Sequence, residues 1–355
     1  MSKPRYFFVG GGDKVNLDFG SLGFDYLQCP YRFEAVFVHG VWRVRGLVED
    51  SAMHLPEGSQ CLHYGQQVFE GMKVHTGADG KVYAFRPLEN ARRMNTGAAY
   101  LRGPRVPEEL FIHGVEEVTR ANLPYVPPHG TGSLYVRPIW LGVDANIGVK
   151  PASSYVFRIF VSPVGPYFKG GFGPEQGKEF LVSKCDRAAP YGTGHIKVGG
   201  NYACSFTPGA EAKGHGYAEA IYLDPSEHKY IEEIGAANFL GFKGKALITP
   251  DSSSILPSIT RRSLMQIASD LFGWPTEQRK IALAELTELD AAAACGTAAV
   301  ITWIRKIVDG DRAWSFPFDD RWQILYDKLV GIQTATEDDP FGWRHEIAAG
   351  DGSYR

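Results

Sequence analysis

The sequence has no strong excess of charge of either sign. Among its 355 residues, 37 are lysine or arginine and 40 are aspartate or glutamate, which gives a formal net charge of -3. A protein that binds nucleic acid usually carries a basic stripe that neutralises phosphates, and no such stripe is present here. The acidic residues also form no long block that would make an interaction tail. Nucleic acid is therefore not an expected partner.

Cysteine is scarce, and long hydrophobic runs are missing. The five cysteines are widely spaced and include no CxxC pair, a pattern that favours reduced thiols in a cytoplasm over a disulfide framework or a zinc site. No segment reaches the roughly 18 apolar residues of a membrane span. The N-terminal MSKPRYFFVGGG lacks the apolar core of a signal peptide. We expect a soluble, cytoplasmic protein without a metal site or a membrane.

Glycine is abundant, with 41 residues, but the standard nucleotide-binding loops are missing. GGFGPEQG lacks the GxGxxG spacing and the strand-to-helix context of a dinucleotide site. The segment around Lys197 is not a Walker A loop, because Val198 and Gly199 follow the lysine in place of Ser or Thr. Nucleotide binding is therefore not predicted.

The length and the hydrophobic patterns predict an α+β chain of about two domains. Turn residues between β-rich runs predict hairpins over 33–44 and 72–87. Further strands are predicted over 133–143, 154–165, 179–185, 218–224, 239–250 and 298–310. Helices are predicted over 89–101, 261–272 and 321–333. The Gly- and Pro-rich segment 166–177 is the predicted hinge.

Lys197 stands in the segment TGHIKVGGNYACS, between apolar residues and glycines. Most lone lysines are solvated surface charges. An amine reacts with a carbonyl only when it is unprotonated, and burial lowers the pKa of a lysine toward that state. The apolar and glycine neighbours of Lys197 permit such a buried position.

Pyridoxal phosphate requires several kinds of partner besides a lysine. A carboxylate holds its ring nitrogen, a donor holds its 3'-oxygen, and cationic or amide groups hold its phosphate. Tyr202, five residues after Lys197, is a candidate for the 3'-oxygen, and Glu233 in YIEEIGAANFLG is a candidate for the ring nitrogen. Arg93 in ENARRMN is a candidate bidentate partner of the phosphate. The ordinary alternatives are an exposed turn acid at Glu233 and an exposed helical arginine at Arg93.

Two turns are candidate anion sites. LPSITRR leads directly into a predicted helix, so the amides of Ile259 and Thr260 would lie at a helix N-terminus, where an anion is favoured. The alternative is that Ser258 or Thr260 only caps the helix. The second turn is CGTAAV, which contains Thr297.

Eight motifs, taken together, resemble those of the branched-chain amino acid aminotransferases of the fold type IV pyridoxal phosphate family. They occur in the family's order: LHYGQQVFEGMK, FRPLENARRM, SLYVRP, SPVGPYF, KVGGNY, EEIGAANFLGF, LPSITRRSL and CGTAAV. The resemblance implies two α/β domains with the active site between them. It implies a smaller N-terminal domain at 1–168, an interdomain loop at 169–176 and a larger cofactor-binding domain at 177–355.

The resemblance assigns roles to the cofactor residues. Lys197 would carry pyridoxal 5'-phosphate and move the proton at the α-carbon of the amino acid, and Tyr202 would bind the 3'-oxygen. Glu233, followed in its motif by Asn238, would keep the ring nitrogen protonated. The implied phosphate ligands are Arg93, Ile259, Thr260 and Thr297.

The resemblance also implies a substrate pocket that accepts both a branched side chain and glutamate. Its aromatic walls would be Tyr64, Phe69, Tyr135 and Tyr167. Arg137 would recognise the distal carboxylate of glutamate. The amides of Thr297 and Ala298 would bind the α-carboxylate, and Ala236 stands where some relatives have a hydroxyl residue. Ile147 and Val149 would lie in a loop that reaches the pocket of the partner subunit in a homodimer.

The implied reaction is the reversible transamination of L-leucine, L-isoleucine and L-valine with 2-oxoglutarate. Within the same fold, the alternatives are a transaminase for aromatic or D-amino acids and an aminodeoxychorismate lyase. A non-catalytic metabolite-binding relative is a further alternative. Some mammalian relatives carry a redox CxxC after their GTA motif, and this chain has Ala299 and Thr302 there, so no thiol switch of that kind is expected.

Overall fold

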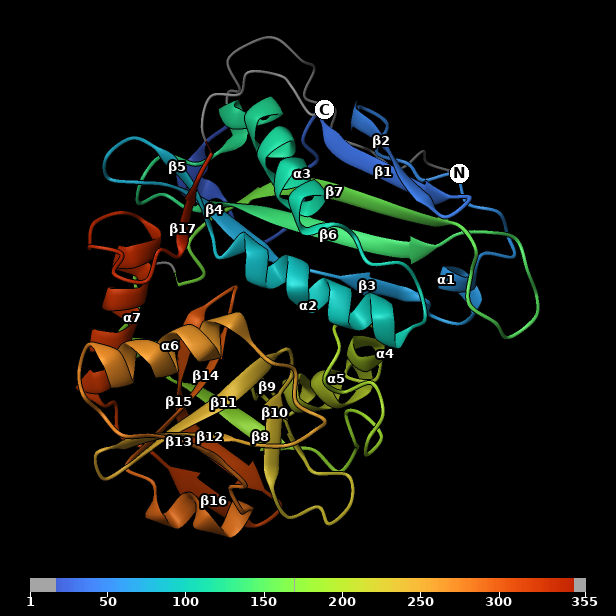
Figure 1. The fold of residues 1–355 in the computed structure, drawn as a ribbon. Helices are drawn as coiled ribbons and strands as arrows, with labels where there is room; N and C mark the ends of the chain where they lie inside the picture. The colour runs from blue at the N-terminus through green and yellow to red at the C-terminus, as the bar shows by residue number, and fades with distance from the viewer. Residues whose placement is uncertain (1–16, 169, 348–355) are drawn as a thin grey trace. The chain divides into compact units, whose positions relative to one another are not determined.

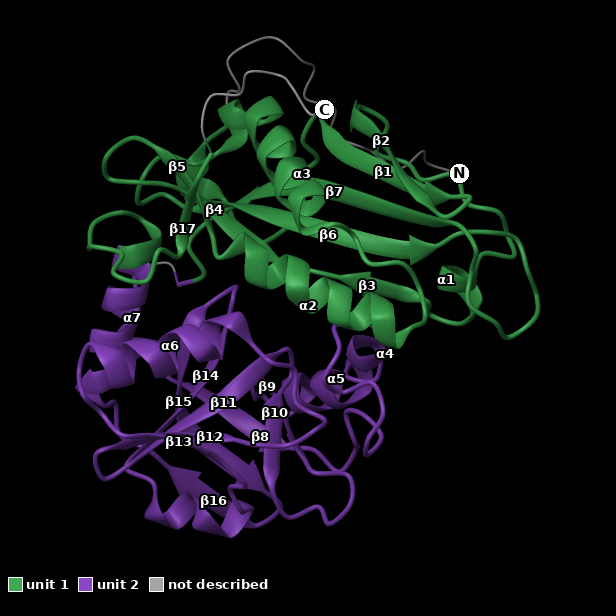
Figure 2. Cartoon of the chain, in the orientation of Figure 1, with its two compact units in different colours: residues 1–167, 332–355 green, residues 168–331 purple. Residues whose placement is uncertain are grey.

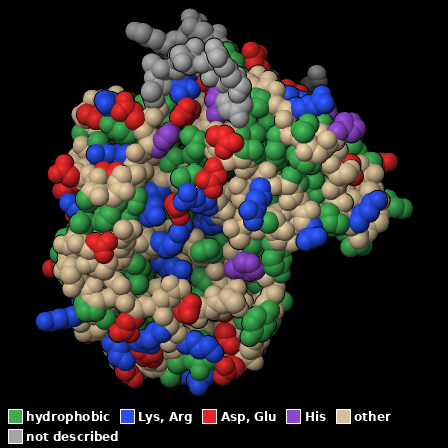
Figure 3. Space-filling view, in the orientation of Figure 1, with side chains coloured by type: hydrophobic (Ala, Val, Ile, Leu, Met, Phe, Trp, Pro, Cys, Tyr) green, Lys and Arg blue, Asp and Glu red, His purple; other side chains and the backbone are tan. Residues whose placement is uncertain are grey.

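The computed structural model describes residues 17–168 and 170–347. The chain divides into two compact units (Figure 2): residues 1–167 together with 332–355, and residues 168–331. Both basic and acidic side chains appear on the visible face (Figure 3). Among the described residues, every helix is too short or too polar to span a lipid bilayer.

The first unit is built on an eight-stranded antiparallel sheet (Figure 1). The strand order is β17-β5-β4-β6-β7-β1-β2, and β3 pairs with β6. The strands are β1 (Arg32–Val38), β2 (Val41–Val48), β3 (Gln67–Phe69), β4 (Met72–Thr76), β5 (Val82–Phe85), β6 (Ser133–Gly142), β7 (Tyr155–Val164) and β17 (Arg344–Glu346). The predicted hairpins over 33–44 and 72–87 are confirmed by the β1–β2 and β4–β5 pairs.

Helices α2 (Pro87–Tyr100) and α3 (Glu108–Ala121) cover one face of this sheet (Figure 1). The strand β6 alternates, with Val136 and Trp140 fully buried, so its side chains at odd positions lie on the opposite face. On the helix side, Phe111 of α3 stacks on Phe157 with ring centroids 5.6 Å apart. A short helix α1 spans Gln60–His63. The sheet face opposite α2 and α3 therefore carries Tyr135 and the other residues at odd positions of β6.

The second unit contains nine strands in the order β10-β9-β8-β15-β14-β11-β12-β13, with β16 paired to β15. Because β10 also pairs with β11, the first six strands of this order form a closed ring. The strands are β8 (Lys178–Val182), β9 (Glu219–Leu223), β10 (Ile231–Ile234), β11 (Ala237–Lys243), β12 (Ala246–Pro250), β13 (Thr276–Arg279), β14 (Ala291–Gly296), β15 (Val300–Asp309) and β16 (Arg312–Ser315). Closure leaves those six strands without a free edge.

Four helices belong to or begin in the second unit: α4 (Gly199–Ala203), α5 (Phe206–Gly214), α6 (Ile259–Asp270) and α7 (Asp320–Gln333). Buried aliphatic and aromatic residues, most of them from the strands of this unit, form its core, among them Ile221, Phe239, Ile248 and Ile304. The predicted helices over 261–272 and 321–333 are confirmed by α6 and α7.

Two features of the structure differ from the sequence-based expectation. The segment 239–250 was predicted as one strand, but β11 and β12 are separated by a turn at Gly244, whose φ is 56°. Residues 332–355 group with the first unit, because β17 pairs with β5. The domain boundaries at 168 and 176 remain predictions.

Candidate active site

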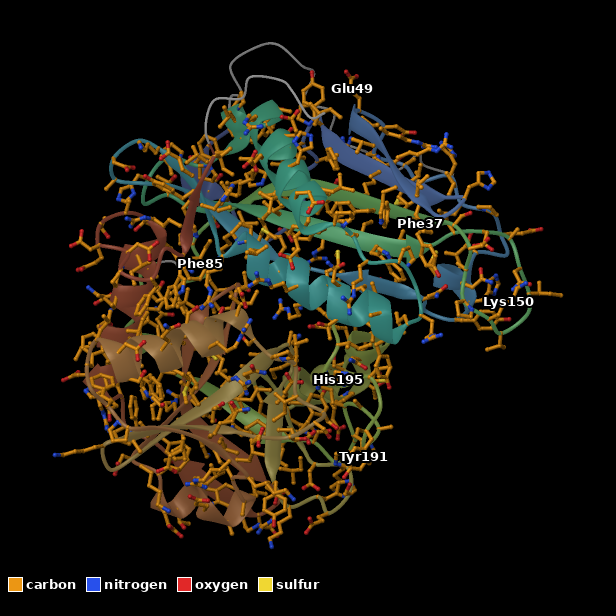
Figure 4. The ribbon with its side chains drawn as sticks, viewed as in Figure 1. Phe37, Glu49, Phe85, Lys150, Tyr191 and His195 are labelled. Carbon is orange, nitrogen blue, oxygen red and sulfur yellow. The ribbon has the colours of Figure 1, made fainter. Side chains whose placement is uncertain are left out.

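Lys197 lies in the loop between β8 and α4, in the second unit. Tyr191 and His195, labelled in Figure 4, lie in the same loop. The side chains on either side of the lysine, Ile196 and Val198, are 1% and 5% exposed. They anchor the loop in the apolar interior, so the position of Lys197 is set by packing on both sides.

The side chain of Asn201 fixes the shape of this loop. Asn201 is buried, and its Nδ2 donates to the carbonyls of Thr193 and Ile196 at 2.7 Å and 3.0 Å. The Thr193 hydroxyl donates to Asn201 Oδ1 at 2.7 Å. Gly194 must be glycine, since a Cβ there would lie 2.2 Å from the carbonyl oxygen of Ser254. The loop is therefore held by buried hydrogen bonds on both sides of Lys197.

The amine of Lys197 is directed at the Tyr202 hydroxyl. Nζ donates to that oxygen at 2.7 Å and lies 4.8 Å from the centre of the tyrosine ring. Lys197 lies two residues before the short helix α4, and the turn of the chain into that helix brings Tyr202 back toward the lysine. The structure thus places two of the predicted cofactor residues in direct contact.

Glu233 is a buried carboxylate near the end of β10. Its Oε1 accepts from Asn238 Nδ2 at 2.7 Å and from the amide of Leu256 at 3.2 Å. Its Oε2 forms an ion pair with Arg187 but has no directed hydrogen bond. Burial raises the pKa of Glu233 to about 7, against the opposing effects of Arg187 and the Leu256 amide. A buried acceptor without a hydrogen bond is costly, so Oε2 is suited to receive an N–H from a bound molecule.

Helix α6 begins close to this carboxylate. Ile259 and Thr260 are its first residues, and both are buried. Their amides precede the first intrahelical hydrogen bond and lie at the positive end of the helix dipole. The Ser258 side chain accepts from the amide of Arg261 at 3.2 Å, so the predicted cap at Ser258 is confirmed. That cap satisfies a different amide, so an anion at the amides of Ile259 and Thr260 is compatible with it.

The turn between β14 and β15 contains Thr297 and Ala298. It lies beside the β10–β11 turn, because Cys295 pairs with Asn238 across the sheet. An added Cβ at Gly296 would lie 3.9 Å from the carbonyl oxygen of Ala236. The structure therefore brings Ala236, Thr297 and Ala298 together near the end of the strand that carries Glu233.

Arg93 belongs to α2 in the first unit, and a carboxylate that was not predicted holds it. Its Nε and Nη2 donate to Oε1 and Oε2 of Glu70, both at 2.7 Å. Glu70 is fully buried and also accepts from Asn90 Nδ2 at 2.8 Å. The Nε edge of the Arg93 guanidinium is thus fixed by a bidentate ion pair, which sets the direction of its remaining donors.

Arg137 lies among aromatic rings on the sheet face opposite α2 and α3. Its guanidinium carbon is 5.1 Å from the centre of the Phe69 ring and 5.3 Å from that of Tyr135. Its Nη2 donates weakly to the Tyr135 hydroxyl at 3.4 Å. Gly71 makes room for that hydroxyl, since an added Cβ would lie 2.0 Å from it. An arginine among rings can contact both a carboxylate and an apolar chain.

A cavity of about 270 Å³ opens beside Arg137 and Tyr135. Its other lining residues come from the segment before β1 and from β7: Phe24, Asp25, Tyr26, Phe160, Ser162 and Val164. Phe24 packs edge-to-face on Tyr135 with centroids 5.5 Å apart. The segment 24–26 was not predicted to contribute to the site, since it lies far from the matched motifs in the chain.

The remaining predicted pocket residues lie at the surface of the first unit. The Tyr64 hydroxyl donates to the carbonyl oxygen of Ile147, so the structure brings these two residues together. Ile147 and Val149 are 90% and 87% exposed, and Tyr167 is also exposed.

The second unit contains the groups that pyridoxal 5'-phosphate requires. It has a lysine amine beside a phenol, a buried carboxylate oxygen without a hydrogen bond, and a helix N-terminus for the phosphate. Sequence reasoning missed Arg187 and Glu70, because each is defined by an ion pair to a residue distant in the chain. Glu70 had one local signal, its position directly before Gly71 inside the motif LHYGQQVFEGMK.

Several known proteins are similar to this chain over most of its length. The model of the family described as amino-transferase class IV matches residues 67–307. The branched-chain-amino-acid aminotransferase of Helicobacter pylori strain J99 is 47% identical over 335 residues, covering 94% of this chain and 98% of that protein. Its Haemophilus influenzae counterpart is 46% identical over 341 residues, covering 92% and 98%. The solved Escherichia coli branched-chain amino acid aminotransferase superposes with a TM-score of 0.73 at 29% identity, covering 90% of this chain and 99% of that one.

Proposed function

The chain belongs to the class IV aminotransferase family, and we infer from this that it is a branched-chain amino acid aminotransferase. Its reaction is the reversible transfer of the amino group of L-leucine, L-isoleucine or L-valine to 2-oxoglutarate, which gives branched-chain 2-oxo acids and L-glutamate. The observation that carries the inference is the set of Lys197, Tyr202 and Glu233 in one unit, where the lysine contacts the phenol and the buried carboxylate has an oxygen without a hydrogen bond.

Pyridoxal 5'-phosphate is the cofactor that we assign to this site, and when bound it supplies an electron sink for the bond broken at the substrate α-carbon. Glu233 would accept the ring N–H at Oε2, and Tyr202 would donate to the 3'-oxygen. The phosphate would be held by the amides of Ile259 and Thr260 and by the Thr297 hydroxyl. Arg93 of the first unit is the proposed fourth phosphate ligand.

Lys197 Nζ is the proposed acid and base of the reaction. It would hold the cofactor at its aldehyde carbon, and, as the free amine once the substrate is bound, it would carry the proton removed from the substrate α-carbon. Tyr202 lies 2.7 Å from Nζ, so its hydroxyl orients the amine. The turn at Thr297 and Ala298 offers amides to the substrate α-carboxylate, with Ala236 alongside.

Substrate recognition is assigned to the first unit. Phe69, Tyr135 and Tyr167, with Tyr64, would surround the branched side chain, and Arg137 would bind the distal carboxylate of glutamate. The guanidinium of Arg137 lies 5.1 Å from the centre of the Phe69 ring and 5.3 Å from that of Tyr135, so the cation and the aromatic rings line the same part of the pocket. One pocket can therefore accept leucine in one half-reaction and glutamate in the other.

We further propose a homodimer in a cytoplasmic compartment. The side chains of Ile147 and Val149 are branched, apolar and exposed. Covering them with a partner would lower the free energy of the assembly. All five cysteines are free thiols, two of them exposed, which favours a reducing compartment. Sedimentation measurements on the purified protein test the dimer, and a monomer at working concentration would contradict it.

The central experiment measures turnover with leucine, isoleucine, valine, phenylalanine and D-alanine against 2-oxoglutarate. We expect turnover with the three branched substrates, and covalent attachment of the cofactor to the Lys197 peptide after borohydride treatment. Lys197→Ala should abolish both. Strong D-alanine turnover without leucine turnover would instead identify a transaminase of other specificity, and a protein that binds no added cofactor would identify a non-catalytic relative.

A further inference from the structure

Arg187 is a buried arginine that connects three segments of the second unit. It lies in the loop after β8 and is 6% exposed. Its Nη2 donates to the carbonyl oxygens of Gly194 and Ser254 at 2.8 Å and 2.9 Å. The same guanidinium forms an ion pair with Oε2 of Glu233. Arg187 thus joins the Lys197 loop, the loop before α6 and the carboxylate of β10.

The carboxylate of Glu233 sits in a mixed electrostatic environment. Burial is the largest influence on its pKa and raises it, and Arg187 is the largest influence that opposes this rise. Lys197 also lowers the pKa of Glu233, while the neighbouring carboxylate of Glu232 raises it. Arg261 and Cys295 also interact electrostatically with Glu233. Without Arg187, burial would favour the neutral acid more strongly.

We propose that Arg187 is a positioning residue that keeps Glu233 ionised and its Oε2 aimed at the ring nitrogen of the bound cofactor. This inference rests on the proposed function, because it requires that Glu233 meets that nitrogen. An ionised Glu233 leaves the proton on the ring nitrogen, while a neutral Glu233 would keep the proton on its own oxygen. Loss of the cation would therefore move one proton from the nitrogen to the carboxylate.

The location of the ion pair supports this role. Arg187 contacts Oε2, and the other oxygen is already occupied by the donors of Asn238 and Leu256. The carboxylate is held by neutral donors on one oxygen and by a cation on the other, so these contacts restrain its orientation and the cation favours its ionised form. A purely structural brace would need only the bonds to Gly194 and Ser254.

The test follows the proton directly. Pyridoxine 5'-phosphate labelled with nitrogen-15 in its ring is bound to wild-type protein, Arg187→Met, Arg187→Lys, Glu233→Gln and the Arg187→Met/Glu233→Gln double variant. The nitrogen chemical shift reports whether the ring nitrogen is protonated. We expect a protonated nitrogen in wild type, an unprotonated one in Arg187→Met at neutral pH, and a shift close to wild type in Arg187→Lys.

The double variant separates the electrostatic effect of Arg187 on Glu233 from the structural effect of its hydrogen bonds to the two loops. If Arg187 acts through Glu233, the nitrogen shift of the double variant equals that of Glu233→Gln alone, because coupled residues are not additive. The kcat of Arg187→Met should fall by about tenfold or more, since each unit in the pKa difference between the ring nitrogen and the carboxylate changes the protonated fraction of the nitrogen by that factor. Raising the pH should not restore it, because both forms of the pair hold the same single proton.

Arg32→Met is the matched control. Arg32 is 2% exposed in the first unit and donates to the carbonyls of Pro30 and Glu49. Its loss should lower stability without moving the nitrogen shift. A protonated nitrogen in Arg187→Met at neutral pH would overturn the inference while leaving the proposed function intact. Failure of wild type to bind the probe would instead refute the proposed function.

Discussion

Arg137 carries the positive charge that distinguishes the two proposed substrates. Replacing it with glutamine removes a charged hydrogen bond to the distal carboxylate of glutamate, a loss of about 1.5–3 kcal/mol. We expect the KM for glutamate to rise by roughly tenfold to a hundredfold, while leucine turnover changes little, and steady-state assays with each substrate check this. Arg45→Gln, at a mostly exposed arginine paired with Glu34, is the control. An equal loss for leucine and glutamate would contradict the assignment.

Glu233 makes the stability of the cofactor-free protein depend on pH. Its pKa is raised from the ordinary 4.5 to about 7 by burial, so between these values the folded state holds a proton that the unfolded state has released. By linkage, the free energy of unfolding falls as the pH rises through this window. As the pH rises from below 4.5 to above 7, the free energy of unfolding of wild type should fall by on the order of 3 kcal/mol relative to that of Glu233→Gln. Urea unfolding at several pH values measures this difference. A constant difference between the two proteins would refute this.

Some of the site residues could be predicted from local sequence, and others could not. Lys197 and Tyr202 are five residues apart, and a single short helix brings them into contact. Glu233 and Asn238 face each other across a tight hairpin. Arg187 meets Glu233 only through the folding of the strand ring, and Phe24 meets Tyr135 only through the packing of a distant segment. No local pattern encodes such long-range contacts.

Helix α3 depends on close packing at Gly114. A Cβ at this position would lie 2.7 Å from Cδ1 of Phe33 and 2.9 Å from Cδ1 of Ile159. Gly114→Ala should therefore destabilise the protein by about 1–3 kcal/mol through overpacking, as measured by denaturant unfolding. Gly214→Ala at the end of α5 faces open space and should leave stability unchanged or slightly higher. Equal effects of the two substitutions would contradict the packing argument.

At the scale of elements, strands bounded by clear turns could be predicted, and elements set by tertiary packing could not. The β1–β2 hairpin is marked by His39 and Gly40, which both have positive φ. The β11–β12 turn is hidden inside a mostly apolar run, so one strand was predicted where two exist. Helix α3 was not predicted, because Gly114 and its β-branched residues weaken the local helical preference.

Binding of the cofactor should stabilise the whole molecule. A ligand that binds only the folded state at about 100 times its Kd adds roughly 2.7 kcal/mol to the free energy of unfolding. Calorimetry with and without pyridoxal 5'-phosphate should show a higher Tm for the loaded wild-type protein and a smaller shift for Lys197→Ala. An unchanged Tm in wild type would contradict the cofactor assignment.

The pairing of β17 with β5 has a consequence for synthesis on the ribosome. The second unit is one continuous segment, residues 168–331, whereas the first unit is completed by residues 332–355. The ribosome makes the first strands of the chain earliest, yet their sheet lacks an edge strand until residues 344–346 have been translated. The unit that begins to emerge first is thus the last to be finished, and the edge of β5 stays unpaired while the whole of the second unit is being made.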